Sequence, residues 1–297
     1  MNVWKEIETE KEIERMVSFI KGYVQAEDEV VVSVSGGMDS DIVARLCCKG
    51  VGNHRVRLFI VIQSDMEEKF LLNARNLAKE LGVPLAEVHL EDQNVALMKA
   101  LEGAQRHKIF DTDMMLELAK AKCSVRSAVI SSYQDKGFLI AGTTNRTEKE
   151  LGFFLTFGDN IAHFKPIAHL YKSELKEVAK ILGTAEEVIN QEPSAGFWKG
   201  QTDLEDIAYW IVNDGPIVYP RRFTEEEQLR VQDIMTFLTQ EKIDYVLAMY
   251  GKGEGVDNIA GQVCLPKEVV EGLVHIVDKA KVLKSRPIMV ELDRNEE

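Results

Sequence analysis

The first half of the chain alternates between helical and extended hydrophobic patterns. Val3–Val24 carries apolar residues at helix-like spacings between charged ones, which predicts an amphipathic helix. The β-branched run Glu29–Val34 ends at a glycine pair, as a buried parallel strand does. The alternation continues with predicted helices at Met38–Cys48 and Glu67–Leu81 and predicted strands at Val56–Ile62 and Leu85–Leu90.

A long helical pattern over Asp113–Asp135 leads into a fourth predicted strand, Phe138–Ala141. Strands that alternate with helices of this length predict an α/β fold with a doubly wound parallel sheet. Ligands of such sheets bind beyond the carboxyl ends of the strands. The loops Ser35–Ser40 and Gly142–Asn145 both follow strands, so they are the candidate binding loops.

Beyond Pro166 the pattern is mainly helical. Apolar residues from Leu175 to Leu182 share one helix face, and Gly183 is suited to end that helix. Pro193–Thr202 has the composition of a loop. Two further helices are predicted over Glu225–Gln240 and Pro266–Leu283.

Composition and charge narrow the class of protein. With 49 acidic and 36 basic residues in 297, the net charge of −13 does not suit a nucleic-acid partner. The four cysteines form no CxxC pair, so they are expected to be reduced and mostly buried. No signal peptide and no apolar stretch of about 20 residues is found, so a cytoplasmic protein without membrane attachment is expected.

The sequence SGGMDS at Ser35–Ser40 is the strongest chemical signal. Its two glycines let the backbone approach an anion, its hydroxyls add donors, and a predicted helix starts directly after it. These properties predict a phosphate-binding loop. Because the chain has no GxxxxGK[ST] motif, the loop is not of the Walker type.

SGGMDS after an apolar strand resembles the loop of the ATP pyrophosphatase group, which has the adenine nucleotide α-hydrolase-like fold. Three longer segments narrow the resemblance: AGTTNRTE at 141–148, KPIAHLYK at 165–172 and EPSAGFWKGQTD at 192–203. Together with LGFFLTFGD at 151–159, they resemble ammonia-dependent NAD synthases in order and spacing. The similarity runs from the first helix to Asp203 and resumes near Ile243.

The resemblance implies an enzyme that uses ATP and Mg²⁺ to adenylate the carboxylate of nicotinic acid adenine dinucleotide (deamido-NAD). Ammonia then converts the adenylate to NAD, with AMP and pyrophosphate as the other products. Free ammonia is the expected donor, since no glutaminase domain accompanies the chain. The resemblance also implies a homodimer.

The resemblance assigns roles to particular residues. Asp39 and Glu148 would ligate magnesium, and Asp39, Lys172 and Ser194 would be catalytic. The residues expected to hold the nucleotide are Ser35, Gly36, Gly37, Met38, Ser40, Arg126, Thr143 and Lys172. Read alone, Asp39 could simply be a carboxylate that favours a helix N-terminus, and Glu148 and Lys172 could be solvated surface residues.

The chain departs from the family where the acid substrate would be chosen. The family has a lysine near Thr156 and a second acid in the segment that reads Asn160 to His163 here. The segment 204–242 also looks like an insertion. The expected organisation is therefore an α/β domain at 1–203, the insertion, and a helical C-terminal extension at 243–297 that packs on the same domain.

Three alternatives stay open. One is a diverged amide synthase that acts on another carboxylic acid, and another is a nucleotide-binding module without turnover. The presence of the proposed magnesium ligands Asp39 and Glu148, together with Lys172, argues against a module without turnover. A protein that only binds a nucleotide would not need the metal ligands. Sulfur-transferring relatives that act on RNA share the glycine loop but need reactive cysteines and a basic face, which this chain lacks.

Overall fold

Four parallel strands form the central sheet. The computed structural model describes residues 8–284 except 65, 156–157, 159 and 218–220. Within this part of the chain, the sheet has the order β3-β2-β1-β4. The strands are β1 (Val30–Ser33), β2 (Val56–Ile62), β3 (Leu85–His89) and β4 (Leu139–Ala141). The predicted parallel α/β sheet is confirmed.

The strand order creates a switch point between β1 and β4. The chain steps outward from β1 to β2 and β3, and then returns to add β4 on the other side of β1. Val30 pairs with Val56 on one side and with Leu139 on the other, so the two edges of β1 are in register. At such a point the loops after the two strands diverge and leave a crevice at the carboxyl edge.

The central strands β1 and β2 are largely buried on both faces because helices cover both faces of the sheet. In β1, Val30 and Val32 belong to one apolar cluster, while Val31 points to a second one with Phe59 and Ile140. An unbroken valine run is therefore required here, where a half-exposed strand would alternate with polar residues.

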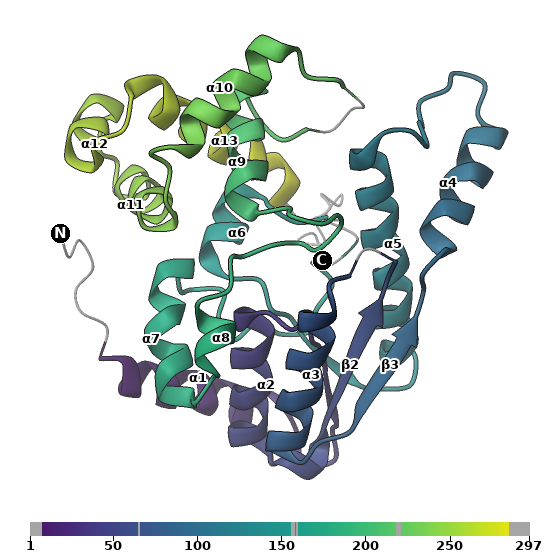
Figure 1. Cartoon of the computed structure of the whole chain (residues 1–297). Helices are drawn as coiled ribbons and strands as arrows, with labels where there is room; N and C mark the ends of the chain where they lie inside the picture. Colours follow the sequence, from purple (N-terminus) through teal and green to yellow (C-terminus); the bar gives the residue numbers. More distant parts are fainter. Residues whose placement is uncertain (1–7, 65, 156–157, 159, 218–220, 285–297) are drawn as a thin grey trace, which may run out of the picture.

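Helices cover both faces of the sheet, as Figure 1 shows. The face on the left of the sheet in that view carries α1, α2, α3 and α7, and α5 packs on β4 with α4 beside it. The bounds are α1 (Thr9–Tyr23), α2 (Met38–Val51), α3 (Glu68–Leu81), α4 (Gln93–Ala104), α5 (Met115–Gln134), α7 (Lys172–Leu182) and α8 (Glu186–Ile189). Two of these helices end where glycine was expected, since Gly82 and Gly183 adopt the left-handed conformation.

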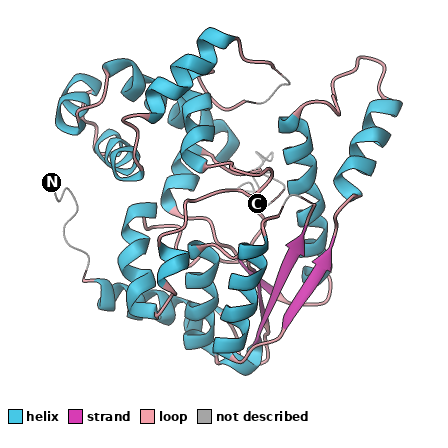
Figure 2. Cartoon of the chain, viewed as in Figure 1, coloured by secondary structure: helices cyan, strands magenta, loops and turns pink. Residues whose placement is uncertain are grey.

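The C-terminal part of the described chain is entirely helical and has its own apolar core (Figure 2). It contains α9 (Asp203–Val212), α10 (Glu225–Met235), α11 (Gln240–Gly251), α12 (Val256–Val263) and α13 (Lys267–Lys284), and it packs on α6 (Arg146–Leu151). Buried residues of α9 and α10, such as Ile207 and Val231, share this core with α11 and α13. That 204–242 is an insertion stays a prediction.

Several helices were not predicted or had other bounds. The helix expected over Glu225–Gln240 stops at Met235, because Thr239 caps a new helix by accepting a hydrogen bond from the Lys242 backbone N–H. The short helices α6 and α9 were not foreseen. Their signals were polar caps, Asn145 and Thr202, whose side chains accept hydrogen bonds from backbone N–H groups three residues on.

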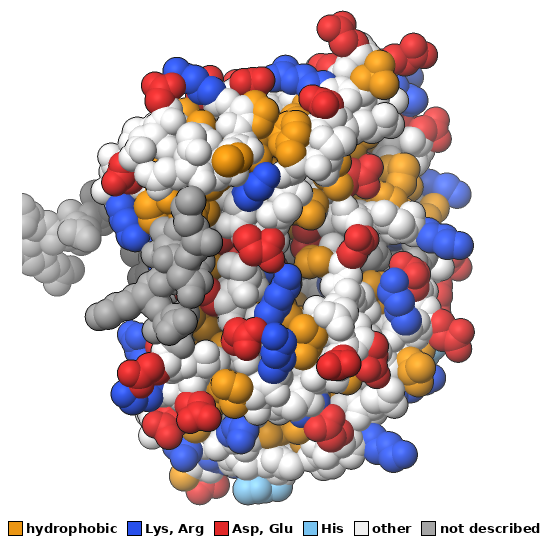
Figure 3. Space-filling model, turned by 60° about the vertical axis from the view of Figure 1, so that its left-hand side comes forward, with side chains coloured by type: hydrophobic (Ala, Val, Ile, Leu, Met, Phe, Trp, Pro, Cys, Tyr) orange, Lys and Arg blue, Asp and Glu red, His pale blue; other side chains and the backbone are white. Residues whose placement is uncertain are grey.

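On the face shown in Figure 3, Lys and Arg side chains lie among Asp and Glu side chains and form no broad basic patch. No helix of the described part of the chain is long and apolar enough to cross a bilayer. All four cysteines are free, and only Cys264 is exposed.

Candidate active site

The loop after β1 is shaped by glycine and by its own hydroxyl groups. The Ser40 hydroxyl donates to the Gly37 carbonyl over 3.0 Å and accepts from the Ser35 backbone N–H over 3.1 Å. The hydroxyl oxygens of Ser35 and Ser40 lie 3.2 Å apart. The loop is thus already curled around the N-terminus of α2, where free backbone N–H groups and the helix dipole favour an anion.

Gly36 is required by both conformation and space. Its φ is +77°, and a Cβ at this position would lie 2.1 Å from the carbonyl oxygen of Phe70. The Asn73 side chain fixes the same peptide by donating to the Gly36 carbonyl over 3.0 Å. Phe70 and Asn73 both belong to α3, so this helix holds the loop in place from below.

Gly36→Ala is expected to destabilise the protein by about 3 kcal/mol, from the strained φ and the clash with the Phe70 carbonyl together. Thermal unfolding and ATP binding would both report the change. Gly22→Ala is the matched control, since nothing lies within 4 Å of a Cβ at that helical position. A Gly36→Ala protein with the melting temperature and the ATP affinity of the parent would contradict this prediction. It would show that the loop can shift to accommodate the Cβ atom.

Asp39, on the first turn of α2, reaches across to the loop after β4. One of its carboxylate oxygens lies 2.6 Å from the Lys172 ammonium, and the other accepts from the Asn145 side chain over 2.8 Å. The Asp39 and Lys172 side chains are each only 12% exposed. Two charged groups this well shielded form a strong, directed pair, not a surface ion pair.

Glu148 joins this group through the cap of α6. Its carboxylate accepts from the Asn145 backbone N–H over 3.1 Å, while the Asn145 side chain accepts from the Glu148 backbone N–H over 2.9 Å. This reciprocal capping box fixes Glu148 at the switch point next to Asp39. The starts of α2, α6 and α7 therefore bring together the three residues Asp39, Glu148 and Lys172.

The charges of this cluster act strongly on one another. Burial, reinforced by the Asp39 carboxylate and opposed by Lys172, raises the pKa of Glu148 well above its usual range. Burial lowers the pKa of Lys172, but Asp39, Glu148 and Asp203 outweigh it and hold that pKa above its ordinary value. Lys172 is therefore charged at neutral pH and compensates the surrounding carboxylates.

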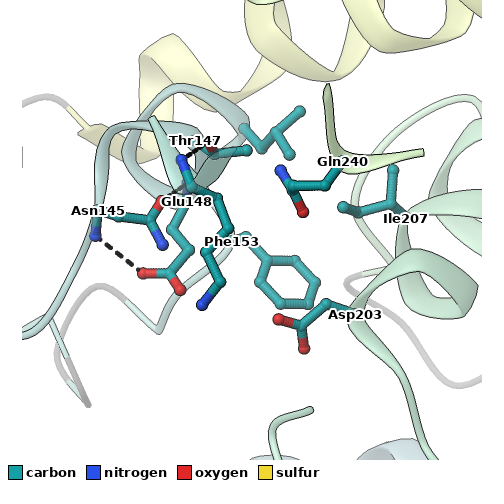
Figure 4. Close-up of a pocket in the computed structure, with 9 residues that line it drawn as sticks. Asn145, Thr147, Glu148, Phe153, Asp203, Ile207 and Gln240 are labelled. Carbon is teal, nitrogen blue, oxygen red and sulfur yellow. Dashed lines mark hydrogen bonds between the residues drawn. The ribbon is translucent and has the colours of Figure 1, made fainter. Parts of the chain in front are cut away.

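Asp203 is a member of this cluster that the sequence prediction missed. It is the first residue of α9, and burial raises its pKa to about 6, with Lys172 opposing the rise. Figure 4 shows Glu148, from α6, and Asp203, from α9, in one pocket, with the ring of Phe153 next to the Asp203 carboxylate. Its sequence signal was the cap Thr202, which places Asp203 at a helix N-terminus.

Because Asp203 deprotonates less readily when folded, its charge is a cost to stability. The unfolded chain loses this proton near pH 4 and the folded chain near pH 6, so between these values stability falls as pH rises. Asp203→Asn is expected to remove this fall. The melting temperature of the variant minus that of the parent should therefore increase from pH 4 to pH 7, and a constant difference would contradict the raised pKa.

A second cleft opens on the other side of the glycine loop. It is lined by Ser35, by apolar residues of β2 and α3 such as Ile60 and Phe70, and by Arg126 and Ser194. It holds about 460 Å³ of space outside atoms, including open solvent at its mouth. An apolar wall with the glycine loop at its edge suits a nucleotide.

Arg126 and Ser194 meet at this cleft. The Arg126 guanidinium donates to the side-chain oxygen of Gln63 over 2.8 Å and lies 4.7 Å from the ring centre of Phe197. The Ser194 hydroxyl accepts from the Gly196 backbone N–H over 3.0 Å. The segment 194–197 is therefore tied to α5 by a cation–π contact and by the Lys122 ammonium, which donates to the Phe197 carbonyl.

Thr143 and Met38 were also predicted to hold the nucleotide. Thr143 is half-buried in the loop between β4 and α6. The Met38 side chain is buried in the core under the sheet, so only its backbone faces the anion site. Of the residues that depart from the family pattern, Thr156 lies outside the described residues, whereas Asn160 accepts a hydrogen bond from the Lys165 ammonium.

The carboxylates at the crevice are the candidate ligands for a metal ion. Among the described residues, no three Asp, Glu, His or Cys side chains gather closely enough to hold one. Magnesium, however, is commonly bound by one or two carboxylates together with substrate phosphates and water. Asp39 and Glu148, beside a glycine loop suited to phosphate, meet that requirement, and each carboxylate oxygen has a second lone pair to offer.

Comparison with known proteins places the chain in a family. The family model for NAD synthase matches residues 12–236. The NH3-dependent NAD+ synthetase of Archaeoglobus fulgidus is 34% identical over 205 residues, which cover 67% of this chain and 78% of the relative. The synthetase of the same name from Methanocaldococcus jannaschii is 26% identical over 281 residues, which cover 94% and 95%.

A solved structure agrees on the fold. NMN synthetase from Francisella tularensis superposes with a TM-score of 0.72 over 97% of this chain and 100% of its own, at 16% sequence identity. At that identity the likeness extends to the fold alone. The sequence relatives and the family model together show that the chain belongs to the NAD synthase family.

Proposed function

We propose that the chain is a ligase that uses ATP and ammonia to convert deamido-NAD to NAD. The observation that carries the proposal is the meeting of Asp39, Glu148 and Lys172 beside the SGGMDS loop, at the switch point of the sheet. Family membership supports the same activity, since the relatives named above are NH3-dependent NAD+ synthetases.

The first step joins the carboxylate of the acid to ATP. A carboxylate oxygen attacks the α-phosphorus, and the bond to pyrophosphate breaks, giving an acyl-adenylate. Carboxylate and triphosphate repel each other, so the site must supply positive charge. In this chain Lys172 supplies a buried cation, while the α2 N-terminus and the hydroxyls of Ser35 and Ser40 provide donors to phosphate oxygens.

The site also suits magnesium. Asp39 and Glu148 would hold the ion together with phosphate oxygens and water, and the ion would supply further screening of the phosphate charge. Burial and the Asp39 carboxylate raise the pKa of Glu148, and a bound metal ion would oppose that rise together with Lys172.

In the second step ammonia attacks the acyl carbon, and AMP leaves. Water would hydrolyse the adenylate at this stage, so exclusion of solvent matters. The segment Ser194–Phe197 lies over the nucleotide cleft and is held by Arg126 and Lys122. We propose that it shields the adenylate and that Ser194 contacts the reacting groups.

A second candidate acid is favoured by one local feature. Where the family has a second acid, His163 accepts a hydrogen bond from the Ile140 backbone N–H over 2.9 Å, so its Nδ1 is committed to β4. Asn160 is likewise committed to Lys165. Neither Asn160 nor His163 therefore presents a carboxylate to a substrate. This difference would suit an amide synthase whose acid substrate lacks part of the dinucleotide.

The test is release of AMP and pyrophosphate from purified protein with ATP, Mg²⁺ and ammonium. Deamido-NAD and nicotinic acid mononucleotide are supplied in parallel, with a third sample that lacks any acid. Release that requires deamido-NAD and yields NAD would support the proposal. Release only with the mononucleotide would support the second candidate, and ATP binding without release would leave a nucleotide-binding module.

The proposal also includes a cytoplasmic homodimer, as the family resemblance implies. Light scattering coupled to size-exclusion chromatography would measure the mass in solution, where a dimer of the 33.5 kDa chain is expected. A mass that stays at one chain across the concentrations used for the assay would contradict it.

A further inference from the structure

A fully buried carboxylate lies behind the active site. Asp244 is on α11, in the helical region, and its exposure is 0%. Its chain neighbours Ile243, Tyr245 and Val246 belong to the apolar core of that region. A carboxylate in such surroundings is costly unless each oxygen is hydrogen-bonded, so its partners indicate what it holds.

The Asp244 carboxylate accepts three hydrogen bonds. One oxygen of Asp244 accepts from the Thr147 hydroxyl over 2.5 Å and from the Gln240 side chain over 2.9 Å. The other oxygen accepts from the Ser173 backbone N–H over 2.8 Å. Only Gln240 lies on the same helix, so two of the three bonds cross to other elements.

The donors of those two bonds, Thr147 and Ser173, are chain neighbours of the active-site residues Glu148 and Lys172. Ser173 follows Lys172 at the start of α7, and Thr147 precedes Glu148 at the start of α6. The Thr147 hydroxyl in turn accepts from the Lys172 backbone N–H over 3.0 Å. Asp244 and Thr147 thus take the first two N–H groups of α7, which no helical carbonyl can satisfy.

We propose that Asp244 is a positioning residue for the reaction, which fixes the backbone at Lys172 and Glu148 from the helical region. The inference rests on the proposed function, since it concerns the geometry needed for adenylation. Asp244 does not line the pocket and does not contact Asp39. It reaches the site through the backbone of Ser173 and through Thr147 and Gln240, which both line the pocket. The contacts of α11 with α6 and α7 provide the rigid support that such a role needs.

The expected effect follows from the geometry of the Lys172 ammonium. It must remain 2.6 Å from Asp39 in a site shielded from solvent. A displacement of about 1 Å in such a site can cost about 100-fold in rate. Loss of Asp244 should therefore lower kcat, whereas the KM for ATP, set largely by the glycine loop, should change little.

Asp244→Asn and Thr147→Val are the two variants to test. Asparagine keeps the shape but offers an NH2 group to partners that donate, and valine keeps the shape of threonine without its hydroxyl. Each is expected to lower kcat by about tenfold or more, with the KM for ATP within about threefold of the parent. Thr147→Ser retains the hydroxyl and should restore most of kcat.

Two further readouts separate positioning from a loss of stability. Hydrogen exchange of the Lys172 and Ser173 amides should be faster in Asp244→Asn, because their acceptors are weakened. The double variant should lose about as much kcat as the larger single one, since both break one network. Ile259→Val, in the same helical core, is the control: it should lower the melting temperature while kcat is retained.

A near-parental kcat in folded Asp244→Asn and Thr147→Val would overturn the proposal. An equal loss of kcat in Ile259→Val, at the same melting temperature as these variants, would also overturn it. If Asp244→Asn does not fold, the contrast between Thr147→Val and Thr147→Ser decides. If the parent releases no AMP with any acid, the proposed function fails. The exchange measurement then decides alone, and unchanged exchange at Lys172 and Ser173 overturns the positioning role.

Discussion

Asp39→Asn is expected to lower kcat for acid-dependent AMP release by about 1,000-fold, with the fold retained. Asparagine has the shape of aspartate, so the Asn145 contact can survive, but the charge that faces Lys172 and the proposed metal is gone. The buried Lys172 ammonium then relies on Glu148 and Asp203 for compensation. Steady-state AMP release and the melting temperature would be measured together.

Asp41→Asn is the matched control for this variant. Asp41 lies on the same turn of α2 and is buried, but it faces away from the crevice and accepts from Arg45 and Thr184, each over 2.6 Å. Its replacement breaks a buried charge pair, so stability should fall by about 3 kcal/mol while kcat is largely kept. Near-normal turnover in Asp39→Asn would overturn the role given to Asp39.

Lys172→Met is expected to lower kcat by about 100-fold or more and to weaken ATP binding. Methionine fills a similar volume without the charge, so three carboxylates lose the cation that they share. The pKa of Glu148 and that of Asp203 should then rise further, because Lys172 lowers both. The activity loss should therefore be greater at pH 6 than at pH 8, where a larger share of these carboxylates stays ionised.

Two variants on α7 control for this result. Lys176→Met removes an exposed lysine one turn further on, whose partner Glu241 lies 3.1 Å away, and it should leave kcat within about twofold of the parent. Lys172→Arg keeps the charge with a different shape and should recover only part of the activity. Equal losses in Lys172→Met and Lys176→Met would mean that α7, and not the Lys172 charge, is what matters.

Much of the sheet and its binding edge was determined by local sequence patterns. The valine run of β1 and the strand β2 were predicted nearly to their bounds, because strands buried on both faces are largely apolar. The edge strand β3 was also predicted nearly to its bounds, although it is mostly exposed. Gly36, Gly82 and Gly183 were recognised because a positive φ selects glycine. Asp39, Glu148 and Lys172 were assigned through motifs that lie on three separate elements.

The helical region was harder to predict because its helices are short and their bounds depend on caps and on packing. Only the tertiary structure shows that α9 and α10 share a core with α11 and α13. The same holds for Asp203 and Asp244, which lie far along the chain from Glu148 and Lys172. A lone acid in a helical stretch has no sequence signal that distinguishes a buried partner from a solvated surface residue.

The sequence by itself therefore determined the parallel sheet and the glycine loop that follows its first strand, because these depend on hydrophobic periodicity and on local backbone geometry. The roles assigned to the site residues stay a prediction. The tertiary structure decided which charges compensate one another. Electrostatic coupling in a buried site depends on distances of a few ångströms between residues that are remote in sequence. Those distances are set by the packing of α6, α7, α9 and α11 around the carboxyl edge of the sheet.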